Sequence, residues 1–112
     1  MQNIEKLLVI DGGGVKGILS QRLIVAKLQR YARIKHKTTI DQLPVSHKIA
    51  ISILLPEFDF KQSYICLLLG LHRSSVYRYQ QQGYFMLKHQ KQFQDIHDEL
   101  YRYIIYNIRY NR

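Results

Sequence analysis

The sequence predicts a mostly helical chain with one N-terminal β-strand, an α/β fragment. Two observations predict this fold class. Residues 6–10 hold the apolar run Leu7-Leu8-Val9-Ile10, which ends abruptly at Asp-Gly, as a short buried strand does. Beyond it, apolar residues recur at helical spacing between Gly, Pro and Asp. The 112 residues suffice for one small domain or for a segment of a larger one.

Helical segments are expected at residues 16–34, 47–55, 60–69, 73–82 and about 87–110. The first follows a glycine-rich turn directly behind the strand. Ser46 and Asp59 are expected to cap the second and third segments, because their short polar side chains can accept from free N–H groups. Gly70 and Gly83 are expected to end the third and fourth. The predicted elements therefore follow one another as strand, glycine turn and a series of helices.

The chain divides into a strand–turn–helix segment, residues 1–55, and a helical region, residues 56–112. The chain contains seventeen Lys and Arg and eight Asp and Glu, which gives a net charge of +9 and a pI near 9.8. The excess is spread evenly, since residues 1–58 carry nine basic and four acidic side chains and residues 59–112 carry eight and four. It favours a polyanionic partner such as nucleic acid, and the alternative is a basic surface without a dedicated ligand.

Cys66 is the only cysteine, so an internal disulfide is excluded and a reducing compartment is expected. The N-terminus lacks the layout of a signal peptide, and no apolar run approaches the ~18 residues of a membrane span. A cytoplasmic location without an integral membrane segment is the prediction. The five histidines show no metal-ligand spacing beside the cysteine, so neither a metal nor a cofactor is predicted.

The segment Asp11-Gly-Gly-Gly-Val-Lys-Gly17 links the predicted strand to the first helix. Three glycines leave the backbone N–H groups bare, so an anion can approach them closely. The segment resembles the opening of patatin-like lipid acyl hydrolases. The resemblance implies that Gly12, Gly13 and Gly14 form an oxyanion hole for a lipid or ester substrate. Asp11, Lys16 and Gly17 complete the motif.

That family also carries a nucleophile elbow, Gly-x-Ser-x-Gly, whose glycines permit a sharp turn. The corresponding stretch here is Pro44-Val-Ser-His-Lys48, so both glycine positions hold other residues. Ser46 is the only candidate nucleophile, and a helix cap is its alternative role. The resemblance therefore implies a truncated or divergent hydrolase segment that is inactive alone. Whether the chain is an enzyme is left open.

The glycine turn has two other interpretations. It resembles the phosphate-1 turn of sugar kinases with the actin-like ATPase fold. That turn usually has Thr at the position of Val15 and leads into a second strand, whereas residues 16–34 predict a helix. The other interpretation is a tight strand-to-helix turn without a ligand.

Residues 62–82 match the pattern of a DNA-binding helix-turn-helix. Cys66 is the small residue of the first helix, and Gly70 stands at the turn four residues later. The apolar positions expected to lock the two helices together are Ile65, Leu69, Leu71, Val76 and Tyr79. The alternative is an ordinary helical hairpin that packs an apolar stripe.

The same residues are similar to the DNA-binding segments of insertion-sequence transposases and some resolvases. The resemblance implies that Arg73 and Arg78 hold phosphates, while Ser74, Ser75 and Tyr77 face bases. The glycine motif is the less degenerate of the two signals. The hydrolase segment is therefore the first interpretation, and a small basic DNA-binding protein is the second.

Overall fold

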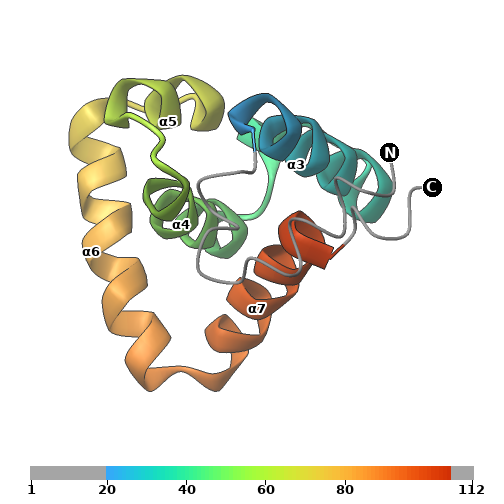
Figure 1. The fold of residues 1–112 in the computed structure, drawn as a ribbon. Coiled ribbons are helices and arrows are strands. Elements are labelled where there is room, and N and C mark those ends of the chain that lie inside the picture. Colours follow the sequence, from blue (N-terminus) through green and yellow to red (C-terminus); the bar gives the residue numbers. More distant parts are fainter. Residues whose placement is uncertain (1–19, 107–112) are drawn as a thin grey trace.

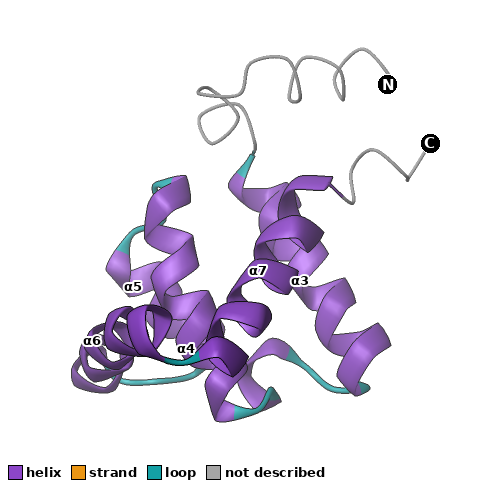
Figure 2. Ribbon diagram, turned by 90° about the horizontal axis from the view of Figure 1, so that it is seen from below, coloured by secondary structure: helices purple, strands orange, loops and turns teal. Residues whose placement is uncertain are grey.

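The computed structural model describes residues 20–106, which form helices joined by short loops (Figures 1 and 2). The elements in chain order are α3 (Gln21–His36), a 3₁₀ turn η2 (Ile40–Gln42), α4 (Val45–Leu54), a 3₁₀ turn η3 (Leu55–Phe58), α5 (Gln62–Leu69), α6 (Arg73–His89) and α7 (Lys91–Tyr106). None of the helices in this described range is long and apolar enough to cross a membrane.

The predicted fold class, an α/β fragment, is wrong, because every regular element between residues 20 and 106 is helical. The predicted strand, residues 6–10, lies outside the described residues. A β-strand is stable only when it pairs with another strand, since its backbone groups otherwise lack partners. Residues 20–106 provide no strand for that pairing, whereas their helices satisfy their own backbone hydrogen bonds.

Helix α4 forms the centre of the molecule. Every residue from Ile49 to Leu54 is buried, because this half of the helix is apolar on all sides except at Ser52. It packs against α6 on one side and α7 on the other. In Figure 1, α6 runs along the left edge and α7 returns from its lower end, so the two helices enclose α4. The core is therefore built around α4.

Helix α3 closes the core on the side of α7. The Ser20 hydroxyl accepts from the Leu23 N–H (3.4 Å) and caps the start of α3, and Lys37 ends the helix in the left-handed conformation (φ 55°). The Tyr31 ring is 1% exposed and meets the Tyr103 ring of α7 edge-on, with ring centroids 5.3 Å apart. This edge-to-face contact is a favoured aromatic geometry and joins the two helices.

Both predicted helix caps are wrong. Helix α4 begins at Val45 with Pro44 at its N-cap, so Ser46 lies inside the first turn and makes no cap hydrogen bond. The fixed φ of proline suits a helix start without a capping side chain. Asp59 closes η3 in the left-handed conformation (φ 66°), and α5 starts three residues later, at Gln62. The Gln21 side chain donates to the Asp59 carbonyl (2.8 Å) and fixes that corner.

Gly83 does not end a helix, contrary to the prediction. Helix α6 continues through it to His89, and Gly83 is buried against α4. A Cβ at this position would lie 2.9 Å from Ile53 Cγ2 and 3.0 Å from Ile49 Cγ2. Glycine is therefore required by the close approach of two helices. The break comes at Gln90, whose extended backbone separates α6 from α7.

Candidate nucleic-acid interface

The turn between α5 and α6 is built around Gly70. This residue adopts a left-handed conformation (φ 66°), which is strained for residues with a Cβ. The Leu71 N–H donates to the Cys66 carbonyl (3.1 Å), and the Gly70 N–H donates to the Leu67 carbonyl (3.3 Å). These two hydrogen bonds satisfy the last carbonyls of α5 and turn the chain sharply. A Cβ on Gly70 would also lie 3.3 Å from Asp41 Cβ.

Helix α6 starts immediately after this turn, with His72 at its N-cap. The Val76 N–H donates to the His72 carbonyl (3.0 Å) and forms the first helical turn. The apolar residues expected to lock the two helices all lie inside or against the core. Ile65, Leu69 and Val76 are buried, and Cys66, Leu71 and Tyr79 are partly buried against the core. Residues 62–89 therefore form two helices around a three-residue turn.

Gln80 holds the hairpin against the central helix. Its side-chain amide donates to the Ser52 carbonyl of α4 (3.0 Å) and to the Gln62 side-chain oxygen of α5 (3.0 Å). The Gln62 amide donates back to the Gln80 oxygen (2.8 Å). One side chain thus joins three helices and fixes the position of α6 relative to α5. The local sequence pattern does not reveal this group, because the partners of Gln80 lie 18 and 28 residues away.

The outer face of α6 carries most of the predicted DNA-binding residues. Arg73, Ser74, Tyr77 and Arg78 are exposed. Ser75 differs from them because it is half-buried, and its hydroxyl accepts from the Arg78 guanidinium (3.3 Å). Four of the five predicted residues therefore share one accessible surface. Ser75 lies at its margin and supports an arginine.

Two further side chains belong to this surface. Gln81 is exposed and donates to the Tyr77 hydroxyl (3.0 Å), which orients the tyrosine ring. Gln62, at the start of α5, lines a shallow hollow together with Arg73, Ser74 and Tyr77. The surface thus joins the N-terminal ends of both helices, where backbone N–H groups favour anions.

The segment that carries this surface contains basic but no acidic residues. No Asp or Glu occurs between residues 60 and 94, whereas that stretch contains Lys61, Arg73, Arg78, Lys88 and Lys91. All five basic residues are exposed, and Lys91 pairs with Asp95 at 3.2 Å. An excess of basic side chains attracts a polyanion from a distance, and the nearby carboxylate is that of Asp41, which lies beside Gly70 at the turn. The lack of acidic residues from 60 to 94 is visible in the sequence, but a count of charges over the two halves of the chain conceals it.

The glycine motif, with Asp11, Gly12, Gly13, Gly14, Lys16 and Gly17, lies outside the described residues. Ser46 lies in the first turn of α4, and its hydroxyl is 3.5 Å from Nδ1 of its neighbour His47. The His47 ring contacts the His36 ring of α3, with centroids 4.6 Å apart. Desolvation and then the His36 charge lower the pKa of His47, against the opposing effect of Glu99.

This histidine pair belongs to the contact between α3, α4 and α7. Burial and the nearby Glu99 carboxylate raise the pKa of Tyr31, whose ring contacts both histidines. In the part of the chain that the structure describes, no three His, Cys, Asp or Glu side chains gather as a metal site requires. The arrangement fits a packing contact between helices.

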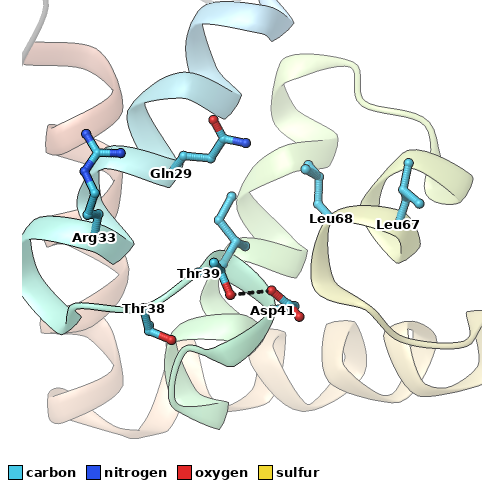
Figure 3. A pocket seen from close by; sticks show the side chains of 8 residues that line it. Gln29, Arg33, Thr38, Thr39, Asp41, Leu67 and Leu68 are labelled. Atoms are coloured by element: carbon cyan, nitrogen blue, oxygen red, sulfur yellow. Dashed lines mark hydrogen bonds between the residues drawn. The ribbon is translucent and has the colours of Figure 1, made fainter.

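A second hollow, of about 380 Å³, lies between α3, η2 and α5 (Figure 3). Its polar wall contains Arg33, Thr38, Thr39 and Asp41, and Leu67 and Leu68 of α5 line the opposite side. The Thr39 hydroxyl donates to the Asp41 carboxylate (2.7 Å) and lowers the pKa of that group. No cysteine, serine or histidine among the described residues lines this hollow.

The comparisons with known proteins give no further constraint on the site. No protein-family model, no curated protein and no solved structure matches this chain.

Proposed function

We propose that this protein binds double-stranded DNA through the α5–α6 helix-turn-helix. The observation that carries the proposal is the exposed face of α6, where Arg73, Ser74, Tyr77 and Arg78 are accessible together. The major groove, about 12 Å wide, admits an α-helix, and the N-terminal part of such a helix meets the base edges. The basic segment of residues 60–94, which contains no Asp or Glu, supports a duplex partner.

The side chains on this face of α6 form two groups, one suited to phosphates and one suited to base edges. Arg73 and Arg78 suit phosphate oxygens, because a guanidinium donates two parallel hydrogen bonds to them. Ser74, Tyr77 and Gln81 carry groups that both donate and accept, which suits base edges. Ser75 contributes through Arg78, since its hydroxyl already accepts from that guanidinium. The Gln80 group holds α6 against α4 and α5, which reduces the entropic cost of binding.

The first experiment measures affinity for a fluorescein-labelled duplex of randomised sequence over a range of salt concentrations. We expect the logarithm of the association constant to fall linearly with the logarithm of salt concentration. Arg73→Ala and Arg78→Ala should each reduce the steepness of that line by about 0.9, one phosphate contact. Arg30→Ala, which removes an exposed arginine of α3, is the matched control and should leave the slope nearly unchanged.

Two results would contradict the proposal. One is binding that does not respond to salt, or no binding at all. The other is an equal loss in Arg30→Ala and Arg78→Ala, because net charge alone would then explain the affinity. Helix content by circular dichroism should be the same in all three variants, since every substituted arginine is exposed.

The hydrolase resemblance stays a second proposal, supported by the glycine motif. The all-helical range 20–106 offers no sheet on which a nucleophile elbow could sit. We therefore expect no turnover of a p-nitrophenyl ester by the isolated chain. Turnover that disappears in Ser46→Ala would contradict this expectation. A cytoplasmic location, favoured by the single cysteine, is likewise proposed.

A further inference from the structure

The exposed face of α6 continues for two turns beyond the residues assigned to the duplex. Tyr77, Tyr84 and Phe85 are 57%, 50% and 60% exposed. We refer to these three residues as the aromatic strip. Gln81, Phe85 and Lys88 follow Tyr77 at helical spacing, so they share one face of the helix. Helix α6 runs along the outer edge of the molecule in Figure 1.

The aromatic strip is distinctive for its position and composition. Among the described side chains, every other Tyr or Phe is buried or half-buried. The exposed aliphatic side chains are spread over other helices, at Leu23, Ile34, Val45 and Leu67. Core packing does not explain the strip, because α6 meets α4 through its opposite face, around Val76 and Gly83. Exposed aromatic rings gathered on one helix face favour a ligand with flat apolar surfaces.

The charge near the strip identifies the class of ligand. Arg78 and Lys88 flank it, and no acidic residue occurs between residues 60 and 94. Aromatic rings interleaved with cations are typical of surfaces that bind unpaired nucleotides, because the rings stack on bases and the cations hold phosphates. In a duplex, neighbouring base pairs cover the faces of the bases. Only an unpaired segment therefore offers those faces to Tyr84 and Phe85.

We propose that Tyr84 and Phe85 stack on unpaired bases next to the duplex, so that the preferred ligand is a duplex–single-strand junction. The inference rests on the proposed duplex binding by the N-terminal half of α6. Phe85 follows Tyr77 by eight positions, about 12 Å along the helix, or three to four base-pair steps of one strand. The His89 ring lies against the Phe85 ring (centroids 4.4 Å apart) and supports it in the exposed position.

The test compares a blunt duplex, the same duplex with a single-stranded extension at either end of either strand, and the single strand alone. Affinities are measured by fluorescence anisotropy for the wild type and for the double variant Tyr84→Leu/Phe85→Leu. We expect one extension to strengthen wild-type binding roughly ten-fold, as stacking of a base on an aromatic ring does. The double variant should lose this gain and keep the wild-type affinity for the blunt duplex. Ile34→Ala, an exposed apolar residue of α3, is the control and should keep the gain.

The outcomes separate the two proposals. If blunt duplex binding depends on Arg73 and Arg78 but no extension strengthens it, duplex binding stands and the junction is overturned. Equal losses for blunt and extended duplexes in the double variant overturn the junction as well. If the single strand binds as tightly as the extended duplex, the junction is overturned, and if the blunt duplex is not bound, both proposals fail. Because both substituted residues are exposed, thermal melting should show unchanged folding.

Discussion

Helices α4 and α6 pack against each other and differ in almost everything else. Helix α4 has ten residues, and the last six are buried and largely apolar. Helix α6 has seventeen residues, of which Val76 and Gly83 are the buried ones. The difference separates two tasks. Side chains of α4 contribute the buried area that stabilises the fold, whereas α6 packs against α4 along one face and keeps its outer face free for a ligand.

The largest loss of stability is expected when a buried side chain of α4 is shortened. Leu54 is fully buried, so Leu54→Ala leaves a cavity and should lower the free energy of unfolding by about 2–5 kcal/mol. Leu67→Ala makes the same chemical change at a side chain that is 74% exposed, and it should alter stability by less than about 0.5 kcal/mol. Urea denaturation followed by circular dichroism measures both. Similar losses in the two variants would contradict the central role of α4.

A smaller loss of stability is expected for a substitution at Gly83, where α6 packs against α4. Gly83→Ala raises helix propensity by about 1 kcal/mol, but the new Cβ meets two isoleucine methyl groups at 2.9 and 3.0 Å. Overpacking of this kind costs about 1–3 kcal/mol. The net result should be destabilisation of about 1 kcal/mol in a urea titration. Gln82→Ala, on the exposed side of the same turn, is the control and should be neutral. A stabilised Gly83→Ala protein would show that the helices can move apart at no cost.

The third prediction concerns the polar link between the two helices. Gln80→Ala removes hydrogen bonds to the Ser52 carbonyl and to Gln62, so it should cost about 1 kcal/mol of stability. Because α6 then loses its fixed position, duplex affinity should also fall at temperatures where the variant is folded. Thermal melting and anisotropy measure the two effects on one sample. Loss of stability with unchanged affinity would show that Gln80 does not position α6 for binding.

Local signals in the sequence predicted much of this architecture. Helical spacing located the helices, and Gly70 was identified as the turn because a left-handed residue after a helix is a local requirement. The prediction that Gly83 ends a helix was wrong, because no local requirement determines the role of this glycine. Its role depends on Ile49 and Ile53, about thirty residues away in the sequence. A glycine that permits close packing and one that ends a helix look alike when only neighbouring residues are considered.

The candidate site likewise has features that local sequence patterns predict and features that they do not. The exposure of Arg73, Ser74, Tyr77 and Arg78 follows from the helical pattern of α6, so the sequence was sufficient to predict it. The half-buried position of Ser75 and the Gln80 group depend on tertiary packing, which periodicity does not specify. Sequence reasoning therefore predicted which face is accessible, and the structure added what holds that face in place.

The smallest expected effect is a dependence of stability on pH. It arises at the contact between α3, α4 and α7, which lies away from α6. His47 of α4 meets His36 and Tyr31 of α3, and Glu99 of α7 influences both His47 and Tyr31. Since the folded protein lowers the pKa of His47 from its usual 6.5, the unfolded chain binds more protons as the pH falls below that value. Stability should therefore be highest above pH 6.5 and should decrease between that pH and the lower pKa of the folded state.

His47→Gln keeps a polar side chain and removes this titration. Urea midpoints measured from pH 7.5 to pH 5 should fall with acidity in the wild type and fall less steeply in His47→Gln. His72→Gln substitutes an exposed histidine at the start of α6 and should keep the wild-type slope. If His72→Gln flattened the slope and His47→Gln did not, acid sensitivity would belong to the helix-turn-helix. The stability of the core and the chemistry of the outer face would then be coupled, contrary to the separation of tasks between α4 and α6.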